Sequence, residues 1–497
     1  MSRSASTPLV GHPGEGVPLS PKEKLKAKID LLRNDPSNVY NPDVLVVGSG
    51  PIGAVFARKL ERSDLFTNDE WEELYKEAET LFNTNVKTFN DSVRHRLVKK
   101  ILQDTIDAEK ADREVQSMPL ACKLGKNKRQ IDWSCTASIL GDKLSNPDNK
   151  NDLDYSKLLT VLPQTQLDAL YIECDGKGDA VKGAVIIDLD TGNEYLVGAK
   201  RYVICGGSVL TAGIVAQSLF KSVLEFKDED GHIGASYLQT LGRYLTEQTM
   251  TFCQIVLKRE YVQWVSDKPE ELDEGDDDTI RDAVRQHKEN HPDDPLPFPF
   301  DDLDPNIYTP FSEKYPWHTQ IHRDAFGYGE APADVDQRLI VDLRFFGYVD
   351  SNKYNKTTFS AKKRDEFGMP QPTFWFSLGK KDVNRSNRMM RDMVDVATSL
   401  GGFLPGAEPR HLAPGLALHV CGIYRAGKEV LNHDGKLGLV KTKDNSVVSK
   451  EGRVWGVSNL YLGGCGIIPT GNASNPTLTA ACHAIAGADQ IIKELDN

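Results

Sequence analysis

Apolar positions follow a clear order near the start of the chain. The run DVLVV at 43–47 is continuously apolar after its first residue, which predicts a strand buried on both faces of a parallel sheet. GSGPIG follows at 48–53, and a helix is expected from Ala54 to Leu60. From Asn68 to about Asp112, apolar residues recur every three or four positions, which is typical of amphipathic helices.

The rest of the pattern alternates between strands and helices. Short strands separated by turn residues are expected from Leu158 to Ile204, where a glycine turn leads into another helix. The segment from Tyr237 to about Pro409 is mixed and rich in proline and aromatic residues. Strand-like runs return at LALHV (416–420) and NLYLGG (459–464), and a last helix is expected near 476–495. Strands alternating with helices predict an α/β protein.

Composition narrows the class of protein. The chain has 497 residues, a net charge of −12 and a mean hydropathy of −0.43, so it is expected to be globular. An acidic chain does not suit nucleic acid, because that ligand requires clustered lysine and arginine. Residues 1–40 resemble a flexible tail and contain no secretory signal, and no apolar run is long enough to cross a bilayer. We therefore expect an intracellular protein, or one released by a non-standard route, without nucleic-acid or membrane partners.

The spacing of the cysteines does not favour a metal site. Eight cysteines are scattered along the chain and form no CxxC pair or metal-like cluster. Free thiols in a reducing compartment are the simplest interpretation. No metal ligand set is predicted.

GSGPIG matches the pattern G-x-G-x-x-G at Gly48, Gly50 and Gly53. The first glycine permits a tight turn, the second lets the backbone approach a pyrophosphate, and the third lets the helix pack on the strand. An ordinary turn in an unrelated α/β fold could carry the same letters, but the preceding strand and the following helix favour a dinucleotide site.

The residues after Leu60 do not continue this unit. A dinucleotide-binding fold places a second strand there, with an acidic residue for the cofactor ribose. This chain has ERSDLFTNDEWEELYKEAE instead, a polar and helical run. A βαβ unit needs about 30 residues or more, so its second half does not fit between Leu60 and Trp71.

Two motifs near the C-terminus contain candidate catalytic residues. In LYLGGCGIIPTGNASNPTLTAACH, a strand runs into Gly463 and Gly464, and Asn475-Pro476-Thr477 opens a helix. His419 lies upstream in LAPGLALHVCG. A single histidine on an apolar strand is more often a core residue than a catalyst; its pairing with Asn475 favours a catalytic role.

Together these motifs resemble the glucose-methanol-choline flavoprotein oxidoreductases, in their branch that oxidises pyranose sugars. The resemblance covers most of the chain from about Trp71 onward, besides the glycine turn. The strings that carry it are HTQIHRDAFGYG (318–329), RLIVDLRFFG (338–347), MPQPTFWF (369–376), GGFLPG (401–406) and the two C-terminal motifs.

The resemblance implies three groups of site residues. His419 and Asn475 would form the catalytic pair. The residues implied to bind the flavin are Gly48, Ser49, Gly50, Pro51, Ile52, Gly53, Gly464, Cys465, Pro476 and Thr477. The residues implied to shape the sugar site are Gln320, His322, Asp324, Phe326, Tyr328 and Arg344, of which Asp324 and Arg344 could equally belong to a buried salt-bridge network.

The chain departs from the family pattern in two places. The segment that follows the first helix in the family carries the ribose-binding acid and a histidine bonded covalently to the flavin, and this chain has no histidine between His12 and His95. We therefore predict non-covalent FAD. After His419, the family's His-Arg-Met-Gly is replaced by Tyr424-Arg425-Ala426-Gly427.

The resemblance implies a doubly wound FAD-binding domain, here truncated, with a substrate domain built from a β-sheet and helices. The expected ranges are a tail at 1–40, FAD-binding segments at 41–236 and 411–497, and a substrate domain at 237–410. The implied reaction is oxidation of a pyranose such as glucose at C2, with oxygen or a quinone as acceptor and hydrogen peroxide as the oxygen product, in a homotetramer. Two alternatives stay open: another alcohol oxidase of this family, or a cofactor-free remnant or incomplete gene model.

Overall fold

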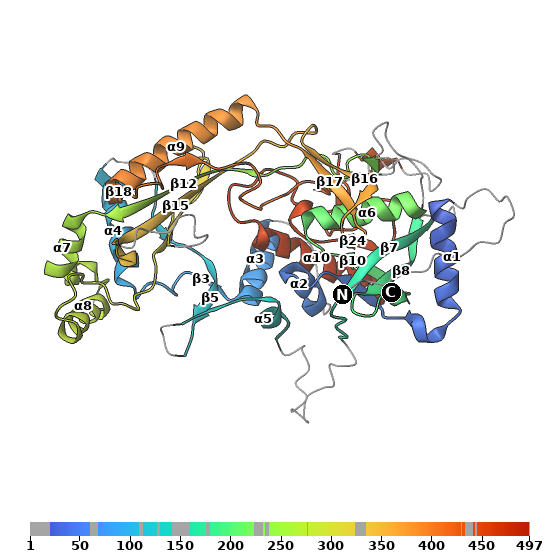
Figure 1. Ribbon diagram of the computed structural model, residues 1–497, viewed down its shortest axis with the longest axis horizontal. Helices are drawn as coiled ribbons and strands as arrows, with labels where there is room; N and C mark the ends of the chain where they lie inside the picture. Colours follow the sequence, from blue (N-terminus) through green and yellow to red (C-terminus); the bar gives the residue numbers. More distant parts are fainter. Residues whose placement is uncertain are drawn as a thin grey trace, which may run out of the picture.

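The structure is a computed structural model of the chain. It describes residues 20–59, 68–108, 113–126, 130–141, 159–174, 179–222, 232–233, 238–275, 277–323, 334–428, 430–432, 441–442 and 445–496. Within these residues the protein is a mixed α/β structure. Figure 1 shows α9, β12 and β15 toward one end of the molecule and α1, β7 and β8 toward the other.

A small parallel sheet joins the start, the middle and the end of the chain. Its order is β2 (Val44–Val47), β10 (Arg201–Ile204) and β24 (Leu460–Leu462), and the ends Val47, Ile204 and Leu462 are in register. Helices α2 (Pro51–Lys59) and α10 (Thr477–Asp496) contact each other beside it. Because parallel strands share one carboxyl edge, the glycine turns that follow β2 and β24 meet there. The predicted strand, turn and helix are confirmed at 44–59, and Leu60 lies outside the described residues.

A second sheet has the order β1 (Val39–Tyr40), β9 (Glu194–Val197), β8 (Asp179–Asp188) and β7 (Thr165–Cys174). The expected strands between 158 and 204 are therefore present, although β10 belongs to the first sheet and not to this one. Helix α6 (Ser208–Ser222) packs against β7.

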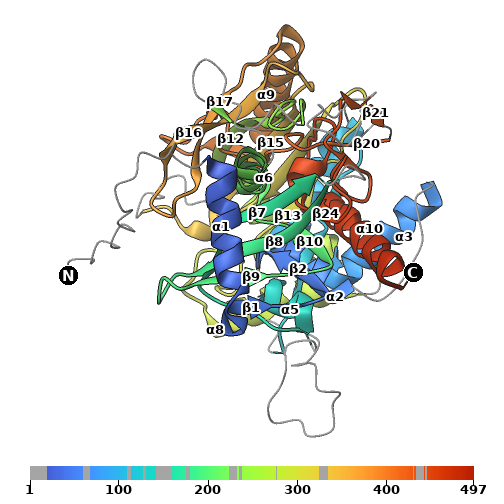
Figure 2. The same ribbon diagram turned by 90° about the vertical axis from the view of Figure 1, so that its right-hand side faces the viewer.

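The prediction of a flexible tail at 1–40 is wrong for residues 21–40. Residues Pro21–Arg33 form helix α1, which lies along the second sheet in Figure 2. Ser20 and Glu23 form a capping box at its start, and Leu25, Ile29 and Leu32 are buried against strands of this sheet. The spacing of these three apolar residues places them on one helical face. Their burial against the sheet holds α1 in place although most of its other residues are charged.

A third, seven-stranded sheet forms the other half of the fold. Its main path is β18 (Gly401–Phe403), β12 (Gln248–Leu257), β15 (Ile340–Tyr348), β14 (Trp317–His322), β13 (Asn306–Tyr308) and β4 (Gln116–Ser117), and β19 (Arg410–His411) pairs with β12. Helices α4 (Val93–Ala108) and α9 (Lys380–Leu400) share an apolar core with it. Side chains alternate along β14, so Trp317 and Ile321 face this core while His318, Gln320 and His322 face away from it.

The helical prediction for 68–112 divides into α3 (Asn68–Phe82), the short strand β3 (Thr84–Asn85) and α4, and residues 109–112 lie outside the described ranges. The remaining helices are α5 (Thr136–Leu140), α7 (Arg259–Asp267) and α8 (Thr279–Asn290). The remaining strands are β5 (Leu120–Leu124), β6 (Ile131–Trp133), β11 (His232–Ile233), β16 (Lys356–Arg364), β17 (Pro370–Trp375), β20 (Ala426–Gly427), β21 (Val430–Asn432), β22 (Lys441–Thr442) and β23 (Val448–Ser449). Among the helices described, none combines the length and the hydrophobicity needed to cross a bilayer.

The expected strand LALHV does not form. Residues 416–420 are a turn followed by irregular backbone, and Leu418 has a positive φ of 59°. An alternating strand cannot include a residue in that region. The predicted strand at NLYLGG and the C-terminal helix are confirmed as β24 and α10.

Candidate active site

The turn after β2 forms an open cradle at the N-terminus of α2. Gly48 has a φ of +113°, and a Cβ there would lie 2.2 Å from the Cys205 carbonyl oxygen; a Cβ on Gly53 would lie 1.9 Å from the Gly48 carbonyl oxygen. A Cβ on Gly50 would meet nothing within 4 Å. Ser49, Gly50 and Pro51 are exposed, whereas Gly53 is buried and Ile52 is half-buried. The packing therefore requires the outer two glycines, while the middle one leaves space in front of the backbone for a ligand. The open space in front of the Gly50 backbone, at the N-terminus of α2, suits a pyrophosphate.

The C-terminal glycine turn lies beside this cradle. A Cβ on Gly463 would lie 2.6 Å from the Phe56 ring and 2.7 Å from the Cys205 sulfur, so the close packing of the two βα units requires glycine. Gly464 has a φ of +119°, and Cys465 begins a short 3₁₀ helix. Pro476 is buried just before α10, and Thr477 is exposed at its first position. The cofactor residues predicted at the two ends of the chain thus follow strands on either side of β10 at one edge of the sheet, apart from Pro476 and Thr477 at the start of α10.

The ribose-binding strand is not found in the described part of the chain. There β2 pairs only with β10, and all four residues of β2 are half-buried, whereas β24 is fully buried. Residues 60–67, where the family segment would begin, lie outside the described ranges.

His419 is half-buried on the irregular segment after Leu418. Its ring lies 5.8 Å from the Phe346 ring, centroid to centroid. Nδ1 lies 2.7 Å from the Gln248 Oε1, and the backbone N–H donates to Glu247 Oε1 at 2.6 Å. Burial, with a smaller contribution from Arg344, lowers the pKa of His419 to about 4. The imidazole is therefore neutral near pH 7, the state in which it can accept a proton.

Asn475 is exposed in the turn before α10, and its side chain contacts the end of a row of buried polar side chains on β14 and β15. Gln320 Nε2 donates to Asn475 Oδ1 at 3.3 Å, and Arg344 donates to Gln320 Oε1 at 2.9 Å. Arg344 also donates through Nε to His322 Nε2 at 2.9 Å, and burial followed by the charge of Arg344 lowers the pKa of His322 to about 3. The structure thus brings together Asn475, Gln320, Arg344 and His322.

Sequence reasoning did not single out His318, Glu247 or Gln248. His318 Nε2 lies 3.4 Å from Gln320 Nε2, and burial lowers its pKa to about 4. Its position two residues before Gln320 on a strand would have been enough to find it. Glu247 and Gln248 have no such signal, since Gln248 is 171 positions from the histidine that it contacts.

Three predicted sugar-site residues cannot be placed. Asp324, Phe326 and Tyr328 lie in 324–333, outside the described residues. Their neighbour Arg323 is described, and its guanidinium lies 3.6 Å from Asp342 Oδ2.

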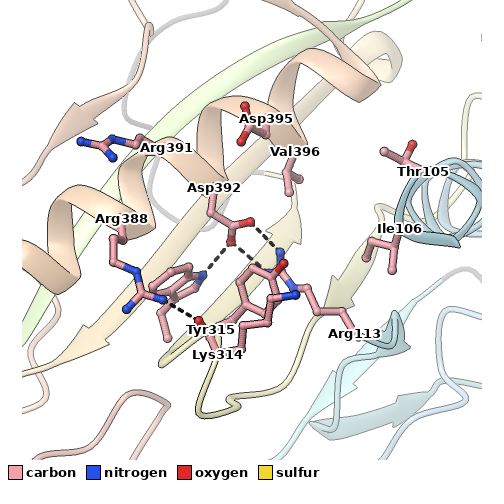
Figure 3. A pocket seen from close by; sticks show the side chains of 11 residues that line it. Thr105, Ile106, Arg113, Lys314, Tyr315, Arg388, Arg391, Asp392, Asp395 and Val396 are labelled. Carbon is pink, nitrogen blue, oxygen red and sulfur yellow. Dashed lines mark hydrogen bonds and ion pairs between the residues drawn. The ribbon is translucent and has the colours of Figure 1, made fainter. Parts of the chain in front are cut away.

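A separate pocket of about 280 Å³ lies on the opposite face of β14, against α4 and α9. Figure 3 shows Arg113 and Asp392 pointing toward each other in it. The Arg113 guanidinium donates two bonds to Asp392, at 2.5 and 3.0 Å, and Trp317 Nε1 donates to the same carboxylate at 2.6 Å. Because Trp317 and His318 face opposite sides of the strand, this pocket is not part of the His419 site. The buried ion pair there is structural.

Asp392→Asn should therefore lower stability without changing the active site. Removing one charge from a largely buried ion pair leaves the Arg113 guanidinium uncompensated, and we expect a loss of about 3 kcal/mol in the free energy of unfolding. Urea denaturation followed by tryptophan fluorescence measures it. Asp395→Asn, one turn away on the exposed side of α9, should change stability by less than about 0.5 kcal/mol. Equal losses in the two variants would contradict a structural role for the pair.

The sheet edge with its two glycine turns defines a dinucleotide-cofactor protein of the α/β class, and the half-buried neutral histidine beside it suits an oxidoreductase.

Comparison with known proteins gives the family. The GMC oxidoreductase family model matches residues 354–484. The chain is 43% identical over 451 residues to pyranose 2-oxidase of Emericella nidulans, covering 88% of this chain and 70% of that one. It is 38% identical to pyranose 2-oxidase of Lyophyllum shimeji, covering 88% and 67%. The chain belongs to the pyranose 2-oxidase family of GMC oxidoreductases.

Among solved structures, the chain matches a formate oxidase variant from Aspergillus oryzae. It has a TM-score of 0.49 and 15% identity, and the match covers 73% of this chain and 64% of that one.

Proposed function

We propose that this protein oxidises a pyranose sugar, such as glucose, at its C2 hydroxyl to give the 2-keto sugar. The observation that carries this proposal is the neutral His419 beside a buried polar row that contacts Asn475. A sugar presents several hydroxyls, and the amide and guanidinium groups of Gln320 and Arg344 match them better than an apolar pocket would.

Each residue would then have a distinct task. His419 Nε2 accepts the proton of the reacting hydroxyl, and the side-chain amide of Asn475 holds the same oxygen in position. Gln320 orients Asn475 through its hydrogen bond, and Arg344 orients Gln320. His318 and His322 stay neutral and add no competing charge, because their pKa values are near 4 and 3.

FAD, the cofactor of this family, supplies the oxidising group when bound. We propose that it is held by the backbone at Gly48–Gly53, with Ser49, Gly50, Pro51 and Ile52 around the pyrophosphate, and by Gly464, Cys465, Pro476 and Thr477 at the other turn. Asp324, Phe326 and Tyr328 are proposed to complete the sugar site. The electron acceptor is proposed to be oxygen, giving hydrogen peroxide, or a quinone, and the assembly a homo-oligomer, as the family tetramer suggests.

The visible absorption spectrum of the purified chain, before and after acid precipitation, tests the cofactor proposal. Flavin bands that move to the supernatant are expected, because no histidine lies between His12 and His95 in the region where the family carries its flavin-linking residue. Bands that stay with the pellet would show a covalent link. Steady-state assays with glucose and oxygen then test the activity.

A cofactor-free remnant is the second candidate, and the half-buried strand β2 favours it, because β2 pairs only with β10 among the residues that the structure describes. A strand with one unpaired edge lacks the neighbour that carries the ribose acid in a complete fold. A protein purified without flavin that also fails to take up added FAD would support this candidate over an oxidase.

A further inference from the structure

We propose that Gln248 is a positioning residue that fixes the proton of neutral His419 on Nδ1 and so leaves Nε2 free to accept a proton. Gln248 is the first residue of β12 and is 3% exposed. The effect on turnover rests on the function proposed above, but the position of the proton on His419 does not depend on it.

The hydrogen bonds of Gln248 determine which end of its amide faces the histidine. Its Nε2 donates to the carbonyl oxygens of Asn472 at 2.8 Å and Ser474 at 2.9 Å. A flipped amide would place its oxygen against both carbonyls and leave its N–H₂ without those acceptors. Oε1 therefore points at His419 Nδ1, 2.7 Å away, and Nδ1 must be the donor.

Glu247, the residue before Gln248, holds the backbone of His419. Glu247 accepts the His419 N–H through Oε1 at 2.6 Å and the Gln248 N–H through Oε2 at 2.8 Å. The preceding Leu418 has a φ of 59°, a conformation unfavourable for leucine, so this segment needs an external anchor. Since Gln248 also binds the carbonyl of Ser474, it links the histidine segment to the turn that carries Asn475.

Several charged or titratable groups face His419. Arg344 lies on β15, His318 on β14, and Glu247 just before β12. Burial is the main reason that the pKa of His419 is lowered to about 4, and the charge of Arg344 adds to it. The partner of Nδ1 is the Gln248 Oε1, and the proposal therefore assigns the proton position to Gln248. Removing the Gln248 oxygen would withdraw an acceptor that the imidazolium needs more than the imidazole, so the pKa should fall further.

The test is ¹⁵N NMR of histidine-labelled protein, which needs neither flavin nor turnover. The His419 signals are assigned by their loss in His419→Gln. In the wild-type protein at pH 7 we expect a protonated Nδ1 and an unprotonated Nε2. In Gln248→Met, which keeps the size but not the polar atoms, we expect the proton to redistribute toward Nε2 and the pKa of His419 to fall. A wild-type spectrum with the proton on Nε2 overturns the proposal, whether or not any variant folds.

A matched control comes from the same strand. Gln254 is also buried on β12, and its Nε2 donates to Asp342 at 2.8 Å, six residues or roughly 20 Å along the strand from Gln248. Gln254→Met should lower stability as Gln248→Met does but leave the His419 signals unchanged. If the two variants alter His419 equally, Gln248 has only a structural role.

Turnover gives a second readout. In Gln248→Met, kcat is expected to fall roughly tenfold or more with a smaller change in KM, since a histidine in the wrong tautomer cannot accept the proton. An unchanged kcat together with the expected NMR change would leave the proton assignment standing and instead count against His419 as the base.

Discussion

His419→Ala is expected to lower kcat for a pyranose substrate by about 10²- to 10⁴-fold, the usual contribution of a general base. The reason is local: the neutral imidazole is held by Gln248 and Glu247 beside the polar row that contacts Asn475. FAD content should stay the same, because the backbone of the two glycine turns, and not His419, is proposed to hold the cofactor. Stopped-flow reduction of the flavin under anaerobic conditions measures the step directly.

The pH profile makes this prediction more specific. Because burial lowers the pKa of His419 to about 4, the wild-type rate should be flat from pH 6 to 8 and decline only in acid near pH 4, not near the ordinary histidine pKa of about 6.5. That acid decline should disappear in His419→Ala. His411→Ala is the matched control: His411 is exposed on β19 and contacts Ser386 instead of the site. Retention of more than a tenth of the wild-type rate in His419→Ala would exclude it as the base.

The elements that carry the cofactor turns could be predicted because their signals are local. A continuous apolar run, a glycine turn and a helix follow one another at 44–59, and the same order recurs at 460–496. The parallel pairing through β10 brings them together, and no local pattern encodes that pairing. Helix α1 was missed because its three anchoring residues are dispersed among lysines.

The candidate active site shows more clearly what a local sequence pattern does not predict. Gln320 and His322 lie on one regular strand, where alternation predicts a shared face, whereas Arg344 joins them through the register of β14 with β15. His419 was expected on a strand, but Leu418 takes a positive φ, and the segment is held by contacts from Glu247 and Gln248 far away in sequence. The positions of catalytic side chains depend on such long-range contacts, and a pattern along one chain does not contain them.

Gly50→Asp is expected to abolish FAD binding while leaving the fold intact. A Cβ on Gly50 would meet nothing within 4 Å, and Gly50 is exposed, so the free protein should accommodate the side chain. The carboxylate would occupy the space in front of the turn and repel the pyrophosphate. We expect affinity for FAD to fall about 100-fold or more, a loss of about 2.8 kcal/mol or more in binding free energy. Fluorescence titration of flavin-free protein with FAD measures it.

Variants at two other glycines distinguish a loss of FAD binding at the turn from a loss of the folded structure. Gly402→Asp is the matched control, because a Cβ on Gly402 also meets nothing within 4 Å, and FAD affinity should be unchanged. Gly48→Ala should unfold the region instead, since its Cβ would lie 2.2 Å from the Cys205 carbonyl oxygen at a φ of +113°. The thermal midpoint of flavin-free Gly50→Asp should therefore match that of the flavin-free wild type, and that of Gly48→Ala should be lower. If Gly50→Asp binds FAD as the wild type does, the turn is not the pyrophosphate site, and the cofactor, if bound, must be held elsewhere on the sheet edge.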